Sequence, residues 1–389
     1  MHPIQILLLL VIYFSAIQTT QAEDENTLQI RIATFNIAMG LNTEGDLYTR
    51  LQSGEDKALQ KVAAVIQMVR PDVLLINEFD WSALDSTRLF VDHYLNKPQF
   101  GNKAIQYSYA LTDEVNTGLD SGLDLNNNGK LADAADAWGF GQFHGQYGMA
   151  VFSQFPLNLS RSFQFFKWKD MPGALQVMNA DGSFFYPDEV REQLRLSSKS
   201  HWDVELTIAG QSLHFLVSHP TPPVFDGPED RNGLRNHDEI RLWADYIDPN
   251  RAGYLYDDSG IKGGLAGGEN FVIAGDLNAD PVDGESSRKA IGQLLDHPLI
   301  NSLCVPASAG AVQAGEAQAG KNLEHQGNPA FDTGDFNDEY VGNMRIDYVL
   351  PSASLKVTAC GVFWPAPDEP GHDLIDVSDH HLVWLDIEI

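Results

Sequence analysis

The chain has 389 residues, a formal net charge of −29, 43% hydrophobic residues and 20% charged residues. A chain of this length can bury a large core in one or two domains, and its acidity excludes a general electrostatic attraction for nucleic acid or for an anionic membrane. Any phosphate-bearing substrate must therefore be attracted by a local cation, which points towards a bound metal ion.

Residues 1–22 are predicted to be a cleaved secretory signal peptide. Ile4 to Phe14 is an apolar run too short for a stable membrane span, and Thr20-Gln21-Ala22 offers small residues at the positions that define a cleavage site. The leading segment has no Lys or Arg, and an uncleaved N-terminal anchor is the alternative. We expect an exported, periplasmic or extracellular protein without stable membrane insertion, in which residues 23–389 form one domain.

The two cysteines, Cys304 and Cys360, are an even pair, which in an exported protein suggests a disulfide. Two separate buried thiols fit the sequence about equally well, because sequence alone cannot establish that the sulfurs are close. Neither cysteine has the spacing of a metal-binding knuckle or of a redox motif.

Two strands and a helix are predicted near the N-terminus. Leu28 to Ile37 changes from alternating to continuous apolar residues, as in a strand that enters a core, and Asn36 lies near its end. Glu55 to Arg70 has apolar residues spaced for one face of a helix. Asp72 to Phe79 is predicted to be a buried strand that ends in Glu78. Polar residues at such strand ends converge on one edge, where α/β folds place their chemistry.

Residues 116–140 are rich in Asp, Asn and Gly and show no periodicity, so we expect an insertion. Asp124-Leu125-Asn126-Asn127-Asn128-Gly129-Lys130 reproduces the first half of a calcium-binding loop. The second half departs from that pattern, because Ala135 stands where an acid is wanted. The two alternatives are a surface excursion and a calcium site made from Asp124, Asn126, Asn128, Asp133 and Asp136.

The middle of the chain contains a predicted core strand, Tyr147 to Ser153, and a hairpin of Trp202 to Ile208 with Leu213 to Ser218. His219 follows the hairpin, and the prolines after it can aim its side chain rigidly.

A charged loop, Asp226 to Asp238, contains Arg231 and Arg235, which can clamp a phosphate or pair with surface acids. We interpret Asn236 as the N-cap of a short helix from Ile240 to Ile247.

Phe271 to Ala274 is predicted to be a short buried strand, with Gly275 permitting a tight turn at its end. Asp276 and Asn278 follow two residues apart, so both side chains can project to the same side. Together they form a plausible pair of acid/base group and anchor. The alternative is an ordinary turn, since Asp, Asn and Pro are turn formers.

The C-terminal part combines a low-complexity segment with two polar strand positions. Residues 307–320 are rich in Ala, Gly and Gln and are predicted to be a mobile surface loop. The strand Arg345 to Leu350 holds Asp347 among apolar neighbours, where a carboxylate needs a partner such as a histidine. Ser378-Asp379-His380 places an acid beside a titratable base just before the closing strand, Leu382 to Leu385.

Carboxylates, amides and histidines at strand ends suit hydrolysis at a phosphate centre. Hard oxygen ligands such as Glu78 favour Mg²⁺ or Mn²⁺ over zinc. Such an ion offsets the charge on the phosphoryl oxygens while a base activates water for in-line attack.

Six short motifs also occur in a familiar order. They are Thr34-Phe35-Asn36, Ile76-Asn77-Glu78, Ser218-His219-Pro220, Gly275-Asp276-Leu277-Asn278, Arg345-Ile346-Asp347-Tyr348 and Ser378-Asp379-His380. This set resembles the endonuclease/exonuclease/phosphatase superfamily, which includes deoxyribonucleases, abasic-site endonucleases, neutral sphingomyelinases and inositol-polyphosphate phosphatases. The resemblance implies an α/β fold, a four-layered α/β sandwich of two mixed β-sheets packed face to face and flanked by helices.

The resemblance also implies ligands for metal and phosphate. Glu78 would bind the metal, Asn36 beside it would orient metal-bound groups or phosphate, and Asp379 would complete the metal environment. Asn278 would hold a phosphate oxygen.

Four catalytic residues are implied in the same way. Asp276 would orient or deprotonate the attacking water, and His380 would stabilise the phosphoryl oxygens or protonate the leaving group. Asp347 would orient His380, and His219 would face the phosphate, as in the deoxyribonuclease and sphingomyelinase branches. Asn77 departs from the family, which commonly has Gln before the metal-binding Glu, so contacts around the metal ligand are in question.

We therefore expect a secreted phosphoric ester hydrolase that uses Mg²⁺ or Mn²⁺, most plausibly a phosphodiesterase or nuclease. The alternatives are a phosphomonoesterase or a phospholipid (sphingomyelinase-like) phosphodiesterase, since acidity without a basic stripe favours a smaller substrate than nucleic acid. A catalytically inactive binding module is the third hypothesis. No protein partner is predicted.

Overall fold

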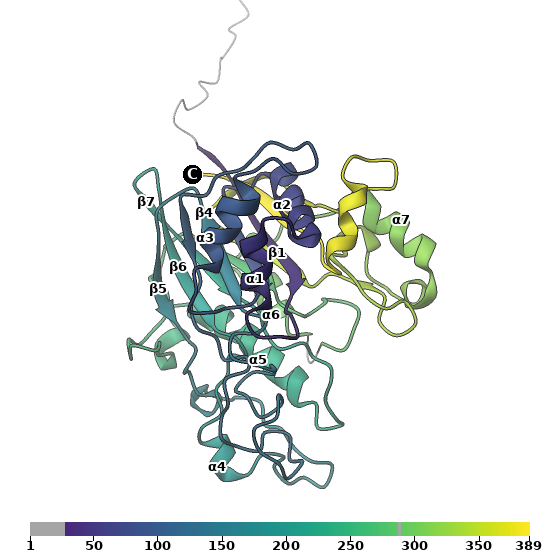
Figure 1. The fold of residues 1–389 in the computed structure, drawn as a ribbon. Helices are drawn as coiled ribbons and strands as arrows, with labels where there is room; N and C mark the ends of the chain where they lie inside the picture. The colour runs from purple at the N-terminus through teal and green to yellow at the C-terminus, as the bar shows by residue number, and fades with distance from the viewer. Residues whose placement is uncertain (1–27, 287–288) are drawn as a thin grey trace, which may run out of the picture.

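Two β-sheets stacked face to face form the centre of the computed structural model, which describes residues 28–286 and 289–389 (Figure 1). The predicted signal peptide, residues 1–22, lies outside the described residues. The six-stranded sheet has the order β12 (Lys356–Val362), β13 (Val383–Glu388), β1 (Gln29–Met39), β2 (Val73–Phe79), β4 (Met149–Ser153) and β3 (Tyr109–Leu111). The five-stranded sheet has the order β11 (Asp347–Pro351), β8 (Phe271–Asp276), β7 (Gln211–Ser218), β6 (His201–Ile208) and β5 (Leu157–Ser162).

Both sheets are mixed, as predicted. β1 pairs with β2 in parallel and β7 pairs with β8 in parallel, whereas the other neighbouring strands of the two sheets are antiparallel. Parallel neighbours carry their carboxyl ends to the same edge, so each sheet brings two strand ends together there.

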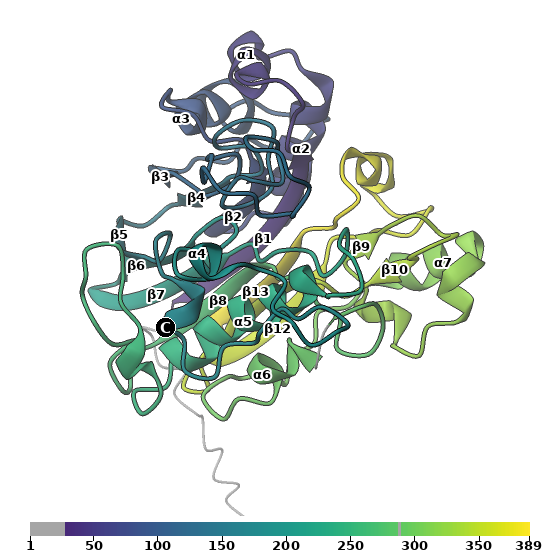
Figure 2. The same ribbon diagram turned by 90° about the horizontal axis from the view of Figure 1, so that it is seen from below.

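Helices cover the outer faces of the two sheets (Figure 2). α1 (Asp46–Ser53), α2 (Lys57–Val69) and α3 (Ser86–Phe90) pack on the six-stranded sheet, and α5 (Arg231–Tyr246) and α6 (Gly292–Leu295) pack on the five-stranded sheet. The predicted four-layered α/β sandwich is therefore confirmed. The remaining helical segments are α4 (Asp188–Arg191), α7 (Ala309–Gln318) and the short turns η1 (Val91–Leu95), η2 (Trp168–Asp170), η3 (Ala252–Tyr254), η5 (Gly320–Leu323), η6 (Pro329–Phe331) and η7 (His372–Val377).

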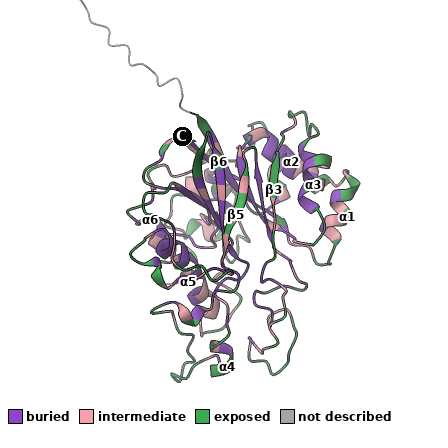
Figure 3. Ribbon diagram, turned by 90° about the vertical axis from the view of Figure 1, so that its left-hand side faces the viewer, coloured by how far each residue is buried: buried purple, intermediate pink, exposed green. Residues whose placement is uncertain are grey.

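The inner faces of the sheets form a continuous apolar layer. Alternate residues such as Ile32 of β1, Leu75 of β2 and Val272 of β8 are fully buried there. The central strands are buried along their length, whereas the edge strands β3 and β5 carry exposed residues (Figure 3). This rigid layer fixes the strand ends that carry the polar residues of interest.

Local signals placed α2 correctly. The side chain of Asp56 accepts a hydrogen bond from the backbone N–H of Leu59 at 3.0 Å, which caps the first turn. The helix ends at Arg70, which adopts a left-handed conformation with φ of 57°, and Pro71 prevents continuation. The predicted helix and its flanking strands are therefore confirmed.

The prediction of a mobile loop at residues 307–320 is wrong. Most of this segment is α7, whose first turn is capped by the Ser308 hydroxyl accepting from the Ala311 N–H at 3.0 Å. Gly310 lies so close to the carbonyl oxygen of Trp364 that a Cβ would approach it to 2.0 Å. Low sequence complexity concealed a helix because alanine is a strong helix former and the small residues dock against a neighbour. A two-stranded ribbon, β9 (Gly334–Asp335) with β10 (Asn343–Met344), lies beside α7 in Figure 2.

The helix predicted from Ile240 to Ile247, with Asn236 as its N-cap, in fact begins nine residues earlier, because α5 starts at Arg231. Asn236 is fully buried inside the helix, and its amide donates to the carbonyl oxygens of Thr221 and Leu277 at 2.8 and 2.9 Å. Its partners are loops that are distant in sequence, which is why the local pattern suggested a cap instead.

Cys304 and Cys360 form a disulfide. The bond joins the segment before α7 to β12 at the edge of the six-stranded sheet, which resolves the alternative that sequence left open. Among the described residues, no helix is long and apolar enough to cross a membrane.

Candidate active site

The polar strand ends of both sheets meet at one edge of the molecule. In the five-stranded sheet, antiparallel pairing places Asp347 of β11 directly opposite Asp276 of β8. In the six-stranded sheet, parallel pairing places Asn36 of β1 beside Asn77 of β2, one residue before Glu78. The sheet stacking then brings the two pairs together, as the sequence predicted.

The amide of Asn36 lies at the centre of the cluster. Its Nδ2 is 3.3 Å from Oε1 of Glu78 and 3.1 Å from Oδ2 of Asp276. The same nitrogen lies 3.4 Å from Nε2 of His380, and the residue is only 1% exposed. One buried amide therefore joins the predicted metal ligand to two predicted catalytic groups.

His380 is oriented by Asp347. Nδ1 of the imidazole lies 2.9 Å from Oδ2 of Asp347, and that oxygen also accepts a hydrogen bond from the Thr333 hydroxyl at 2.8 Å. On its other side, Nε2 lies 3.7 Å from Oδ2 of Asp276. The Ser378 hydroxyl accepts from the His380 N–H and donates to the Asn36 carbonyl, which ties the histidine loop to β1. The partner that Asp347 required is thus a histidine, as expected.

His219 follows β7 and reaches Asp276 from another direction. Its Nε2 lies 3.3 Å from Oδ2 of Asp276, while its Nδ1 is buried and has no hydrogen-bond partner within the described part of the chain. Gly275 permits this approach, since a Cβ there would come within 2.0 Å of the Ser218 carbonyl oxygen. The predicted turn at Gly275 is absent from this described segment, because β8 continues through Asp276 and the glycine serves close strand packing.

Glu78 occupies a conformation that is rare for its residue type. Its φ of 58° lies in the left-handed region, which costs free energy in any residue with a side chain. The strain turns the side chain at the end of β2 towards Asn36. Such strain at a strand end is typical of a functional position rather than of a solvated terminus.

Asn278 and Asp379 lie at the border of the cluster. One N–H of the Asn278 amide donates to the Pro220 carbonyl at 3.2 Å, which leaves its second N–H for another acceptor. The backbone N–H of Asn278 donates to Oδ1 of Asp276 at 3.0 Å. Asp379 is exposed, and its charge acts on both Glu78 and His380. Their predicted roles therefore remain predictions, in positions that permit them.

The charges of the central pair follow from burial and mutual attraction. Burial alone would lower the pKa of His380, but the carboxylates of Asp347 and Asp276 outweigh it and raise this pKa to about 10. Burial and the charge of Asp347 raise the pKa of Asp276 to about 7, against the opposing effects of His380 and Asn36. Near neutral pH, the site holds an imidazolium beside a carboxyl group that titrates in the physiological range.

Two further groups are shifted by the same environment. Burial raises the pKa of Glu78, and the attraction of His380 and the hydrogen bond from Asn36 only partly reverse this. Burial lowers the pKa of His219 well below its usual value, and the nearby positive charges of Lys199 and His380 lower it further. His219 is therefore a neutral imidazole at neutral pH, able to accept or donate a proton.

Lys199 is a member of the site that sequence reasoning missed. It is only 6% exposed, and its ammonium group forms no hydrogen bond or ion pair with any residue that the structure describes. Burial lowers its pKa, while the carboxylates of Glu239, Glu78 and Asp276 act in the opposite direction. The only local signal was a lysine within a serine-rich stretch before a strand, which by itself predicts nothing.

The comparison with known families agrees with this geometry. The profile of the endonuclease/exonuclease/phosphatase family matches residues 33–380, which is most of the chain.

The chain belongs to this family.

Proteins of the endonuclease/exonuclease/phosphatase family are metal-dependent phosphoester hydrolases. No curated protein matches the chain.

Solved structures with a similar fold are distant in sequence. An endonuclease/exonuclease/phosphatase protein from Beutenbergia cavernae is 16% identical, with 93% of this chain and 72% of that chain covered and a TM-score of 0.48. A family protein from Leptotrichia buccalis is 15% identical, with 92% and 100% covered and a TM-score of 0.49. A beta toxin variant from Staphylococcus aureus with bound magnesium ions is 12% identical, with 92% and 99% covered and a TM-score of 0.46.

The donor set of this family member fits a divalent cation. Ligand atoms of Asp276, Asp347 and His380 all lie within 4.8 Å of one another, the one such group among the described residues. Oδ2 of Asp347 is engaged by His380 and Thr333, while its Oδ1 is buried without a partner among the described residues. Within the same part of the chain, Glu78 accepts only the long contact from Asn36. A half-buried carboxylate with so few partners is stabilised by a cation. Glu78 is therefore the carboxylate best placed to hold one, and Asp276 lies beside it across the Asn36 amide.

Asn77, where the family commonly has Gln, links the two sheets. Its Oδ1 accepts from the backbone N–H of Asp276 at 3.1 Å and from the Thr34 hydroxyl at 3.3 Å. Asn77, which replaces the usual Gln, therefore connects β2 to β8 beneath the site through its shorter side chain.

α5 supports the same edge from outside. The carboxylate of Glu239 accepts from the backbone N–H groups of Ser198 and Thr221 at 2.6 and 2.7 Å. Trp243 donates its indole N–H to the Ser218 hydroxyl at 2.9 Å. This helix therefore fixes the segments that carry Lys199 and His219.

The charged loop predicted for Asp226 to Asp238 ends where α5 begins, so Arg231 and Arg235 lie in the first turns of this helix. Neither presents a free guanidinium group to a phosphate. Arg231 pairs with Glu229, and Arg235 donates to backbone carbonyl oxygens of Leu196, Trp138 and Arg195. Of the two roles considered for them, the structural one holds.

The predicted calcium loop is a surface insertion with its polar side chains gathered together. The Asp124 carboxylate accepts from the backbone N–H groups of Asn128 and Gly129, at 3.1 and 2.9 Å. Asp133 accepts from the amides of Asn126 and Asn128. Asp136 is fully buried and accepts from the Leu125 N–H at 2.9 Å, so it braces the loop from within. Calcium binding remains a prediction.

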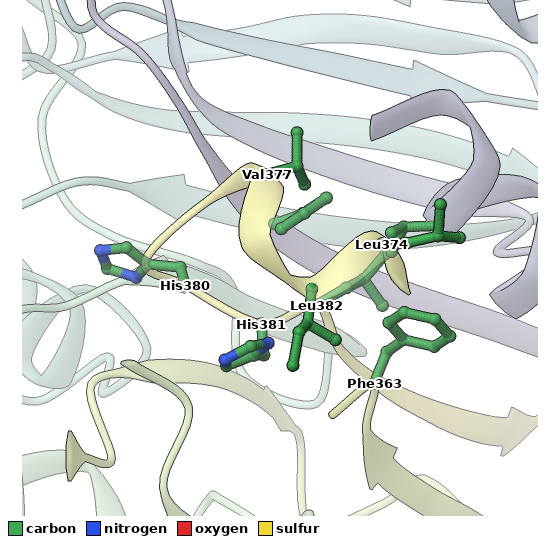
Figure 4. Close-up of a pocket in the computed structure, with 9 residues that line it drawn as sticks. Phe363, Leu374, Val377, His380, His381 and Leu382 are labelled. Atoms are coloured by element: carbon green, nitrogen blue, oxygen red, sulfur yellow. The ribbon is translucent and has the colours of Figure 1, made fainter. Parts of the chain in front are cut away.

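A small apolar cavity lies behind His380, lined by residues such as Phe35, Val65 and Leu374. Its volume of about 10 Å³ barely holds one water molecule. Figure 4 shows the rings of His380 and His381 on the side away from Leu374 and Phe363. This cavity is a packing gap and not a substrate site.

Proposed function

We propose that this protein is a secreted phosphodiesterase that requires Mg²⁺ or Mn²⁺ and hydrolyses its substrate by in-line attack of an activated water. The observation that carries the proposal is the buried amide of Asn36, in contact with Glu78, Asp276 and His380. A metal ligand, a base and an acid held within a few ångströms are the parts that phosphoester hydrolysis requires.

Glu78 and Asn36, with Asp379 at the border, would hold the metal ion, which would offset negative charge on the phosphoryl oxygens. Asp276 takes the proton from the attacking water, because its pKa of about 7 makes it a competent base at neutral pH. The backbone N–H of Asn278 keeps the other oxygen of Asp276 in place.

His380 acts opposite the base. As an imidazolium held by Asp347, it donates a hydrogen bond to a phosphoryl oxygen or a proton to the departing oxygen. His219 and Asn278 contact the remaining phosphate oxygens through N–H groups that have no other acceptor. Lys199 adds a basic side chain at this edge of a protein whose formal net charge is −29.

Two observations support a diester of moderate size. The net charge of −29 opposes binding of a long polyanion, and the two arginines near the site are engaged in structural contacts. A phosphomonoester or a nucleic acid remains the alternative substrate. Export is supported by the apolar N-terminal run and by the disulfide, since such bonds persist in oxidising compartments.

A substrate panel tests the proposal. Protein stripped of metal with EDTA is assayed with added Mg²⁺ or Mn²⁺ against bis-p-nitrophenyl phosphate, plasmid DNA and p-nitrophenyl phosphate. We expect metal-dependent cleavage of the first substrate, whereas cleavage of the monoester alone would contradict a phosphodiesterase.

Two variants locate the activity. Asp276→Ala and His380→Ala are expected to abolish hydrolysis while the melting temperature changes little. Matched controls are Asp368→Asn at an exposed carboxylate and His325→Ala at a half-buried histidine, both expected to keep full activity. If wild type turns over no substrate, the enzyme hypothesis fails and the binding-module hypothesis gains support.

A further inference from the structure

A second cavity, of about 190 Å³, opens beside the proposed active site. Its walls come from the segment between β1 and α1, the first turn of α1, the segment after β2 and the segment before β4. It adjoins the site because Asp80 lies two residues beyond Glu78, and because the ring of Tyr147 packs on Gly40 where Oε2 of Glu78 also approaches. A group attached to a phosphate at Glu78 can therefore enter it.

The lining of this cavity is aromatic and acidic. It includes Tyr48, Trp81, Phe143 and His144, together with the acidic side chains of Glu44 and Asp80. Glu44 is exposed, whereas burial raises the pKa of Asp80 to about 7. The rings of Trp81 and His144 lie 5.1 Å apart between centroids. Among the described residues that line it, none is a lysine or an arginine. Aromatic faces with nearby carboxylates attract organic cations and repel phosphate.

The walls are held by hydrogen bonds that do not depend on a ligand. The Asp80 carboxylate accepts from the backbone N–H groups of Leu41 and Tyr147 at 2.9 and 2.8 Å. The Trp81 N–H donates to the Gly145 carbonyl at 2.8 Å, and the Gln146 amide donates to the Leu41 carbonyl at 2.7 Å. The three segments are therefore tied to one another, and the cavity is preformed.

One polar atom at the cavity has no partner. Nε2 of His144 is buried and forms no hydrogen bond within the part of the chain that the structure describes. A buried nitrogen without a partner is costly, so it normally has a structural or ligand-binding reason. Because this nitrogen is itself buried, a ligand in the open cavity does not contact it.

We propose that this cavity binds an ammonium group carried by the substrate, which rests on the proposed phosphodiesterase function. The phosphate would lie at Asn36 and Glu78, and the ammonium group would lie among Tyr48, Trp81 and Phe143. A quaternary and a primary ammonium share this chemistry. A nucleobase would also stack on aromatic rings, but the exposed carboxylate of Glu44, in a lining without a lysine or an arginine, favours a cation.

Four chromogenic diesters test the subsite. The kcat/KM values for p-nitrophenyl phosphocholine and p-nitrophenyl phosphoethanolamine are divided by the value for bis-p-nitrophenyl phosphate, with the p-nitrophenyl ester of thymidine 5′-phosphate as the fourth substrate. We expect at least one ammonium ester to exceed the reference about tenfold. Equal values, or a Trp81-dependent preference for the thymidine ester, would overturn the proposal.

Variants assign the preference to the cavity. Trp81→Leu and the exposed Glu44→Gln are each expected to reduce the preference for ammonium esters about fivefold or more, whereas Glu55→Gln, at an exposed acid outside the cavity, leaves it unchanged. The ratio of the values for the phosphocholine and phosphoethanolamine esters separates a quaternary from a primary ammonium. If Glu44→Gln and Trp81→Leu both keep the full preference, the cavity is not the subsite.

A binding measurement distinguishes failure of the subsite from failure of the enzyme function. Choline and ethanolamine are titrated against wild type and Trp81→Leu while tryptophan fluorescence is recorded. Trp81-dependent quenching without hydrolysis of any ester would reject the enzyme function and keep the subsite. Hydrolysis of bis-p-nitrophenyl phosphate without quenching or ester preference would reject the subsite alone.

Discussion

At the level of single residues, Asp276 and His380 act as a coupled pair. Asp347 contacts His380 directly, and its negative charge raises the pKa of both partners. Neither pKa shift can be read from the sequence, because both depend on burial and on the charge of Asp347. This residue lies 71 positions after Asp276 and 33 positions before His380.

The pH dependence of hydrolysis follows from these charges. A base must be deprotonated, so activity is expected to rise as pH passes about 7, the pKa of Asp276. An acid must be protonated, so activity falls as pH passes about 10, the pKa of His380. Asp347→Asn removes the charge that raises both values, so both limbs of the kcat/KM profile should move to lower pH. If the pH profile of kcat/KM in Asp347→Asn is the same as in wild type, Asp347 does not set the pKa values of Asp276 and His380.

Lys199 gives a second prediction at this scale. Lys199→Met should lower kcat/KM for a phosphodiester by roughly 10- to 1,000-fold, because a charge-assisted contact with the phosphate is lost. The unfolding free energy of the Lys199→Met variant should stay within about 1 kcal/mol of the wild-type value. A buried ammonium group without a close partner adds little to the stability of the folded state. Lys199→Arg should recover part of the rate, and Lys103→Met at an exposed site is the control. A large drop in melting temperature would identify a structural lysine instead.

At the level of elements, the insertion at residues 116–140 is attached to the active-site edge. The Asn116 N–H donates to the Lys199 carbonyl at 3.0 Å, and its amide donates to the carbonyl oxygens of Gln164 and Ser197 at 2.8 Å. Gly139 packs so tightly that a Cβ would lie 1.9 Å from the Ser198 carbonyl oxygen. The insertion therefore braces the segment that carries Lys199.

The calcium prediction belongs to this element. If the loop binds calcium, a concentration about 100 times the dissociation constant should stabilise the protein by about 2.7 kcal/mol, which raises the melting temperature by roughly 3 °C. Asp133→Asn should remove the effect, because Asp133 lies beside Asn126 and Asn128. Asp181→Asn, at an exposed turn elsewhere, is the control. If millimolar calcium does not raise the melting temperature of wild type, the insertion is a surface loop that does not bind calcium.

At the level of the whole molecule, the disulfide closes a loop of 56 residues around the C-terminal third. Loop-closure entropy predicts that removing it with Cys304→Ser and Cys360→Ser costs up to about 4 kcal/mol of unfolding free energy. Urea unfolding of oxidised and reduced wild type measures the same contribution without substitution. Coincident unfolding curves for the two forms would show that the cross-link adds no stability.

Local patterns placed the central strands and α2 correctly, because apolar periodicity and capping act over a few residues. They misplaced the start of α5 and missed α7, because Asn236 bonds to loops far away in sequence and Gly310 docks on Trp364. The strand-end residues of the site could be predicted because the strands themselves follow from local apolar periodicity. The distances between these residues could not be predicted from the sequence.

The sequence by itself determined the sandwich, the strand ends and the family, since short motifs and periodicity are local properties. Tertiary structure decided which of those ends touch. It placed Asn36 between Glu78 and Asp276, paired Asp347 with His380, joined the cysteines and buried Lys199 beside the carboxylates. It also enclosed an aromatic cavity beside Glu78. The physical reason is that pKa, ion pairing and cavity shape depend on neighbours in space, which strand order and sheet stacking bring together from distant parts of the chain.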